Sequence, residues 1–196
     1  MKKFEGMTDE ALALLYVKGN NSAFDELLSR TQSKLFTYIM FVVHDHDVAD
    51  DIFQETFVKA IIKLQNGQYT DSGKFQFWVT RIAHNLIIDY YRQVRSENLQ
   101  STDDTDANIL NRKELSDITI EDTMVNNQIQ SDVRRLIRSL PANQREVLVL
   151  RYYKNLSFKE IADITGVSIN TALGRMRYAV LNLRRMAEEH DIALRM

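Results

Sequence analysis

Apolar and polar positions alternate with a helical period along most of the chain, and the pattern is sharpest in residues 157–185. It predicts two helices joined by a tight turn. Ser157 and Glu160 have the spacing of a capping box, so we expect the first helix to begin there. Gly166 suits the positive φ that ends such a helix, and Ser168 suits the N-cap of the next one. A short helix, a turn with glycine and a longer helix are typical of a helix-turn-helix.

The second helix of this pair has an apolar side and a basic side. We expect six residues to face inward: Ile169, Ala172, Leu173, Met176, Val180 and Leu183. The other side has Thr171, Gly174, Arg175 and Tyr178, with Arg177, Arg184 and Arg185 along its flanks. The 168–185 segment has four arginines and no acid, which favours a helix that enters the DNA major groove over a hairpin with a solvated basic face.

The same period predicts four helices in the amino-terminal half. They cover about 8–20, 24–43, 47–64 and 75–95. Thr8 is a suitable N-cap for the first helix. The polar stretch 44–47 interrupts the helical pattern between the second and third helices. Two further helices, on either side of Pro141, precede the helix-turn-helix. The chain is therefore expected to be all-α.

A polar, mostly acidic surface is left on the third helix opposite its apolar stripe. It consists of Asp47, Asp50, Asp51, Gln54, Glu55 and Lys59. Such a surface is either simply solvated or a docking site for a basic partner, and periodicity leaves both interpretations open.

The fourth helix interleaves aromatic and basic residues. Arg81, Asn85 and Arg92 share a stripe that suits single-stranded DNA, because bases stack on rings while cations follow the backbone. For these three residues, spacing alone leaves DNA binding and a simple solvated surface equally open. For Phe75 and Trp78 we favour core packing over contact with DNA. His84 is expected at the surface or close to DNA.

Composition narrows the class of protein. With 44% hydrophobic and 27% charged residues, the sequence is typical of a soluble globular protein. The chain has no cysteine, which excludes disulfides and thiolate metal sites and suggests a reducing cytoplasm. It also has no apolar run long enough to span a bilayer, and its first residues do not have the basic-then-apolar pattern expected of a signal peptide.

The net charge of −2 is unevenly distributed. Residues 96–126 have eight acidic and two basic residues, whereas residues 127–196 have twelve basic and seven acidic residues. Because the local field attracts phosphate, the basic carboxyl-terminal part suits DNA. We therefore expect a helical domain at 1–95, an acidic flexible linker at 96–126 and a second helical domain at 127–196.

Three stretches in order resemble the extracytoplasmic-function (ECF) group of bacterial sigma factors, the promoter-recognition subunits of RNA polymerase. Asp47-x-Ala49-x-Asp51-x-x-Gln54-Glu55-x-Phe57 is similar to the family's core-binding helix. Phe77-Trp78-x-x-Arg81-Ile82-Ala83-x-Asn85-x-x-x-Asp89-Tyr90-Tyr91-Arg92 is similar to its promoter-melting helix. Leu140-Pro141-x-x-x-Arg145-Glu146-Val147-x-x-Leu150-Arg151-Tyr152, with the helix-turn-helix after it, is similar to sigma region 4.

The resemblance implies a non-enzymatic sigma factor with two helical domains, sigma regions 2 and 4. Core RNA polymerase would be bound by Asp47, Asp50, Asp51, Gln54 and Glu55. The −10 element would be bound by Lys74, Trp78, Arg81, Asn85, Arg92 and Arg95. The −35 element would be bound by Ser168, Asn170, Thr171, Gly174, Arg175, Arg177 and Tyr178. The implied partners are core polymerase, promoter DNA and an anti-sigma factor, which is membrane-bound in many relatives. No cofactor, metal or small-molecule substrate is expected.

Two features lie outside the shared pattern. Many relatives have Lys-Ser-Arg where this chain has Leu173-Gly174-Arg175, which implies a different −35 preference. The acidic linker suits a positively charged channel such as the polymerase's RNA exit path, and neutralising Asp103, Asp104 and Asp106 would test that hypothesis.

Two other functions compete with this interpretation. One is a helix-turn-helix regulator with a ligand-sensing domain, although the amino-terminal half has no glycine-rich turns or strands typical of sensors. The other is a metal-dependent hydrolase built on residues 44–47, which is disfavoured because adjacent alternating residues at a helix break rarely converge on one metal.

Overall fold

The computed structural model describes residues 4–69, 73–98 and 127–189. Within these ranges it has eight α-helices and no strand, which confirms the all-α prediction. The chain divides into two compact units, residues 1–97 and 98–196. Most of the predicted acidic linker, with Asp103, Asp104 and Asp106, lies outside the described residues. No helix in the described part is long and apolar enough to cross a membrane.

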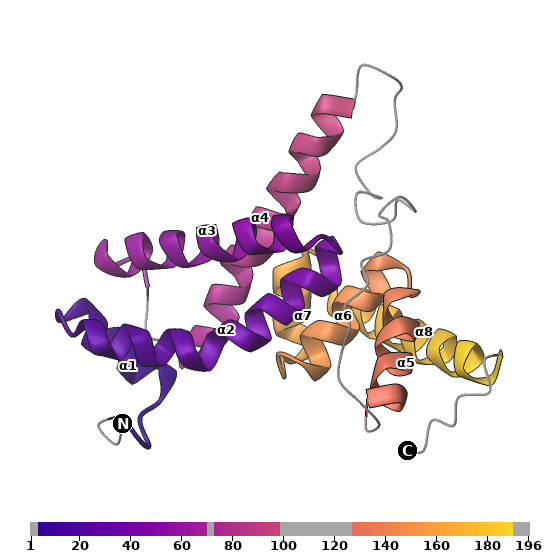
Figure 1. Cartoon of the computed structure of the whole chain (residues 1–196), viewed down its shortest axis with the longest axis horizontal. Coiled ribbons are helices and arrows are strands. Elements are labelled where there is room, and N and C mark those ends of the chain that lie inside the picture. The colour runs from indigo at the N-terminus through magenta and orange to yellow at the C-terminus, as the bar shows by residue number, and fades with distance from the viewer. Residues whose placement is uncertain (1–3, 70–72, 99–126, 190–196) are drawn as a thin grey trace. The chain divides into compact units, whose positions relative to one another are not determined.

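The first unit, drawn from indigo to magenta in Figure 1, contains four helices. They are α1 (Asp9–Val17), α2 (Asn21–Val43), α3 (His46–Gln65) and α4 (Phe75–Asn98). Helix α2 packs against both α1 and α3. The core includes fully buried leucines from three helices: Leu12, Leu27, Leu35 and Leu64. The predicted helices are confirmed, with α4 extending three residues beyond Arg95.

The predicted break between α2 and α3 is made by backbone geometry and a cap. His44 ends α2 in the left-handed conformation at φ 59°. Asp45 is the N-cap of α3, and its Oδ1 accepts a hydrogen bond from the Val48 N–H at 3.0 Å. Helix α3 therefore begins at His46, one residue earlier than its periodicity indicates.

The second unit, drawn from orange to yellow in Figure 1, contains α5 (Asn127–Arg138), α6 (Ala142–Tyr152), α7 (Phe158–Thr165) and α8 (Ile169–Glu189). The guanidinium of Arg145 is buried at the corner between α5 and α6. Its Nη1 donates to the carbonyls of Arg138 at 2.7 Å and Leu140 at 3.2 Å. This side chain thus satisfies the last carbonyl of α5, which the helix cannot pair itself, and a second carbonyl in the turn that follows. Helix α8 packs against both α6 and α7.

Candidate nucleic-acid and partner interfaces

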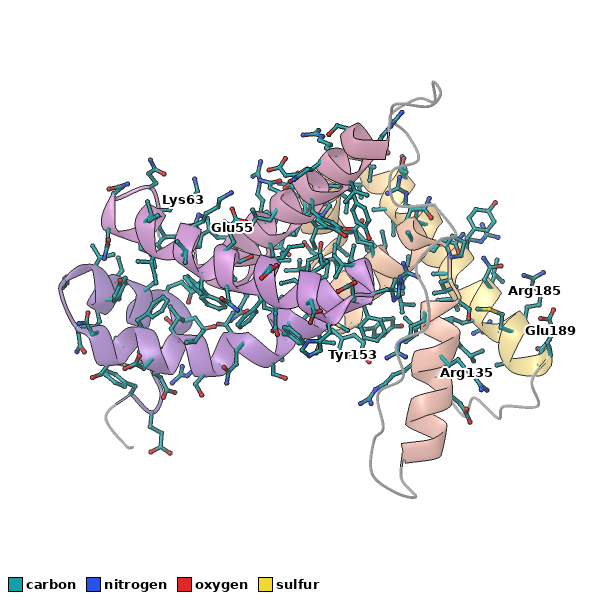
Figure 2. All side chains as sticks on the ribbon, turned by 45° about the horizontal axis from the view of Figure 1, so that its top comes forward. Glu55, Lys63, Arg135, Tyr153, Arg185 and Glu189 are labelled. Carbon is teal, nitrogen blue, oxygen red and sulfur yellow. The ribbon has the colours of Figure 1, made fainter. Side chains whose placement is uncertain are left out.

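The outer side of α3 is acidic and open to solvent. Asp47, Asp51 and Gln54 are exposed, and half of the Asp50 side chain is exposed. Figure 2 shows Glu55 on the side of α3 that faces away from α2. The Glu55 carboxylate pairs with Lys59 at 3.0 Å on the same helix. All five predicted partner-binding residues therefore lie on one accessible surface.

Two apolar residues continue this surface toward the end of α3. Val58 and Ile62 are 54% and 50% exposed. They follow Gln54 at intervals of four residues, so the three side chains lie on one side of the helix. The sequence analysis missed both residues because it counted only polar and charged side chains on this surface. The spacing from Gln54 was the signal that could have identified them.

The outer side of α4 presents the predicted basic stripe. Arg81, Asn85 and Arg92 are all exposed. Arg92 pairs with Asp89 at 3.6 Å, one helical turn away. Arg95, predicted to share this role, is half-buried. Three exposed polar groups thus repeat along α4 at a spacing suited to following a nucleic-acid strand.

The inner side of α4 is fixed to α2 by two hydrogen bonds. The Tyr91 hydroxyl donates to the Val42 carbonyl at 3.0 Å, and the Tyr38 hydroxyl lies 3.1 Å from His84 Nδ1. His84 is buried, so the prediction that it lies at the surface is wrong. Its polar nitrogen is accommodated in the core by Tyr38, which lies 46 residues away in sequence.

An aromatic cluster lies at the start of α4. The rings of Phe75 and Trp78 are both within 6 Å of the Tyr69 ring, with centroid distances of 5.8 Å and 4.9 Å. Phe75 is fully buried, as predicted, whereas Trp78 is half-buried. Lys74 is exposed one residue before the helix. A half-buried ring and a lysine therefore lie beside the basic stripe.

Carboxylates of α1 hold the first turn of α4. Glu10 Oε1 accepts a hydrogen bond from the Phe75 N–H at 3.0 Å, and Asp9 Oδ2 accepts one from Gln76 Nε2 at 2.7 Å. Burial alone would raise the pKa of Glu10. Hydrogen bonds from the Phe75 and Glu10 backbone N–H groups and from the Thr8 hydroxyl outweigh it, so the pKa of Glu10 lies below its ordinary value.

The helix-turn-helix has the local geometry that the sequence predicts. The Glu160 N–H donates to Ser157 Oγ at 3.3 Å, and Glu160 Oε2 accepts from the Ser157 N–H at 2.8 Å, which completes the capping box. Gly166 ends α7 at φ 68°. Ser168 Oγ then accepts from the Thr171 N–H at 3.0 Å and caps α8.

The buried side of α8 differs from the prediction. It is centred on three alanines, Ala172, Ala179 and Ala187, which are at most 3% exposed. Ile169 and Leu173 are 46% and 43% exposed, so the expectation that they face inward is wrong. The predicted stripe included Ala172, which is buried as expected, but it omitted Ala179 and Ala187 and included the larger Ile169 and Leu173 instead.

The outer side of α8 is basic, and its predicted DNA-binding residues are accessible. Ser168, Asn170, Thr171, Arg177 and Tyr178 are exposed, while Gly174 and Arg175 are half-buried. A Cβ added at Gly174 would meet no other atom within 4 Å. The fold itself therefore leaves room for a side chain at this position.

The residues of the candidate metal site take part in the helix break instead. Asp45 caps α3, and His46 Nδ1 lies 3.5 Å from Asp50 Oδ2. In the part of the chain that the structure describes, no group of three or more His, Asp or Glu side chains is placed to hold a metal ion.

The comparisons with known proteins give the family. A model described as sigma-70 region 2 matches residues 27–97, and one described as sigma-70, region 4, matches residues 130–176. The RNA polymerase sigma-H factor of Pseudomonas aeruginosa is 31% identical over 172 residues, which cover 86% of this chain and 88% of that protein. The chain belongs to the ECF group of the sigma-70 family. It is an alternative sigma factor of RNA polymerase.

Other relatives of this ECF sigma factor match it over similar lengths. The ECF RNA polymerase sigma-E factor of Escherichia coli is 31% identical over 177 residues, covering 88% of this chain and 90% of that protein. The ECF RNA polymerase sigma factor SigW of Bacillus subtilis is 26% identical over 175 residues, covering 88% and 92%.

Solved structures share the fold of this sigma factor. CnrH in complex with the cytosolic domain of CnrY is 25% identical with a TM-score of 0.61, covering 92% of this chain and 97% of that chain. The sigma factor RpoE of Bartonella quintana, solved with the anti-sigma factor NepR, is 22% identical with a TM-score of 0.64, covering 84% and 96%. The ligand-sensing regulator is not supported, because its sensor domain would occupy the residues that match sigma-70 region 2.

Proposed function

We propose that this sigma factor divides promoter recognition between its two units. Residues 1–95 act as sigma region 2, residues 127–196 act as sigma region 4, and residues 96–126 connect them. The matches to sigma-70 region 2 at 27–97 and to region 4 at 130–176 support this division. The protein acts by binding rather than by catalysis, and as a polymerase subunit it works in the cytoplasm.

Core RNA polymerase binds the outer side of α3 in this proposal. Asp47, Asp50, Asp51, Gln54 and Glu55 supply negative charge and hydrogen-bond acceptors for a basic partner surface. Val58 and Ile62 extend the contact with apolar area at the other end of the same side. A polar rim beside apolar contact area is the usual composition of a protein–protein interface.

The −10 element binds α4 as an opened single strand. The main observation in support of this proposal is the exposure of Asn85. It lies between Arg81 and Arg92 on a helix whose opposite side is fixed by long-range hydrogen bonds. Trp78 and Arg95 extend the contact along the same helix, and Lys74 extends it just before the helix begins. Extracting a base from the stack costs a few kcal/mol, and polar and stacking contacts on a rigid helix offset that cost.

The −35 element is read as duplex DNA by α8. Arg175, Arg177 and Tyr178 lie in the first half of the helix, which is the half that contacts base edges in a helix-turn-helix. Ser168, Asn170, Thr171 and Gly174 complete the surface. An anti-sigma factor is a further proposed partner, supported by the likeness to CnrH in its complex with the cytosolic domain of CnrY.

Run-off transcription with purified core polymerase tests the proposal on a library of promoter fragments. We expect specific initiation that requires this protein and falls at least about tenfold, or about 1.4 kcal/mol, in Asn85→Ala and in Arg175→Ala. Asn21→Ala and Arg135→Ala, at exposed positions on other helices, are the matched controls. Tight duplex binding without polymerase, and no polymerase-dependent initiation, would contradict the proposal.

A further inference from the structure

Leu173 is a large apolar side chain that packing does not explain. It lies on α8 with 43% of its surface exposed, one residue from the fully buried Ala172. The buried side of the helix is already filled by alanines. Ile169 and Leu181 are also exposed apolar residues of α8. Leu173 differs from them because it lies between Asn170 and Arg177, two of the residues proposed to contact DNA.

The neighbours of Leu173 on the helix surface are polar groups suited to nucleic acid. Asn170 lies three residues before it and Arg177 four residues after it, and side chains at these spacings are adjacent on a helix. Both are exposed. The 168–187 segment has four arginines and no acid, so the surface around Leu173 complements phosphate.

The major groove offers one apolar group to such a side chain. Arginine and asparagine read base edges by hydrogen bonds, whereas the C5-methyl group of thymine is read by apolar contact. Leu173 is the fifth residue of α8, within the amino-terminal half that reaches base edges in helix-turn-helix proteins. Gly174 follows directly and has no side chain to hold the helix away from the groove.

We propose that Leu173 reads a thymine methyl group in the −35 element. This inference depends on the proposed function and makes it more specific, because it names the chemical feature by which this sigma factor selects its promoters. Leu173 acts as a specificity-determining residue beside Asn170 and Arg177, which supply hydrogen bonds.

Replacing thymine by uracil removes that methyl group alone and so isolates the contact. Preferred −35 duplexes are first selected from a randomised promoter pool with holoenzyme containing the wild-type chain. Each thymine is then replaced singly by uracil, and initiation is measured. For wild type we expect one position at which uracil lowers initiation about fourfold, which corresponds to one buried CH₂ group. For Leu173→Ala we expect thymine and uracil to be equivalent at that position.

Two further variants sharpen the test. Leu181→Ala removes a leucine that is 48% exposed and lies eight residues further along α8, about 12 Å along the axis, so it should keep the full uracil effect. Leu173→Lys should shift the preferred base from thymine toward guanine, whose O6 and N7 accept hydrogen bonds.

The outcomes separate this inference from the proposed function. Equal uracil sensitivity in Leu173→Ala and wild type would overturn the role of Leu173 while leaving −35 recognition by α8 intact. Loss of the effect in Leu181→Ala as well would also overturn it, because the contact would then not be local to Leu173. Initiation that does not depend on the −35 duplex at all would overturn both.

Discussion

Gly174 allows the demands of folding and of DNA recognition to be measured separately. It lies inside α8, where glycine is about 1 kcal/mol less favourable than alanine. A Cβ at this position meets no protein atom within 4 Å, so no steric cost offsets the gain. Gly174→Ala should therefore raise the unfolding free energy by about 1 kcal/mol, or the Tm of this unit by about 4–8 °C.

The same substitution should weaken promoter recognition if the glycine serves close approach to DNA. A methyl group forced into a tightly packed contact costs about 1–3 kcal/mol, so −35-dependent initiation should fall by about tenfold or more. Gly174→Ser is the matched variant. It adds the same Cβ with a smaller gain in helix propensity, so it should lose as much initiation and gain roughly half of the stability.

Thermal unfolding of the full chain tests the expected gain in stability, and run-off transcription tests the expected loss of initiation. A variant that is more stable and initiates as well as wild type would refute the close-approach reasoning. An unchanged or lower Tm in Gly174→Ala would refute the claim that the protein itself leaves room for a side chain there.

The remaining predictions concern the first unit. Glu10→Gln should weaken the hold on the first turn of α4 and cost about 0.5–2 kcal/mol, measured by denaturant unfolding. Because the folded-state pKa of Glu10 is lowered, its contribution is present above the unfolded-state pKa and is lost as pH falls through the folded-state value; a wild-type minus Glu10→Gln difference that stayed constant on acidification would contradict this. Asp51→Lys should slow association with core polymerase, most strongly at low salt, whereas Asp25→Lys, at an exposed position on α2, should leave the rate near that of wild type.

Local signals in the sequence predicted local structure well. The capping box of Ser157 and Glu160 and the glycine at 166 each act within a few residues, and the structure has them as predicted. The break at residues 44–47 was predicted for the same reason, since capping by Asp45 is a local preference.

Long-range partners were not predictable in the same way. His84 was expected at the surface or close to DNA because it lies beside Arg81 and Asn85 in sequence. Its actual partner, Tyr38, reaches it from another helix. The bond between Glu10 and Phe75 joins residues 65 apart. On α8, helical period alone did not separate the alanine side from the adjacent Ile169 and Leu173, because the spacings of both sets fit a helical period.

The alanines on the buried side of α8 have a consequence for how such proteins diverge. Ala172 and Ala179 are fully buried, so a larger residue at either position would push the helix away from its neighbours. Substitutions on the opposite side meet no such obstacle. After a gene duplication, two copies could therefore acquire different promoters through outward-facing changes while the domain stayed folded. Changes on the outer side of α8 would thus alter which promoters are recognised with little loss of protein stability.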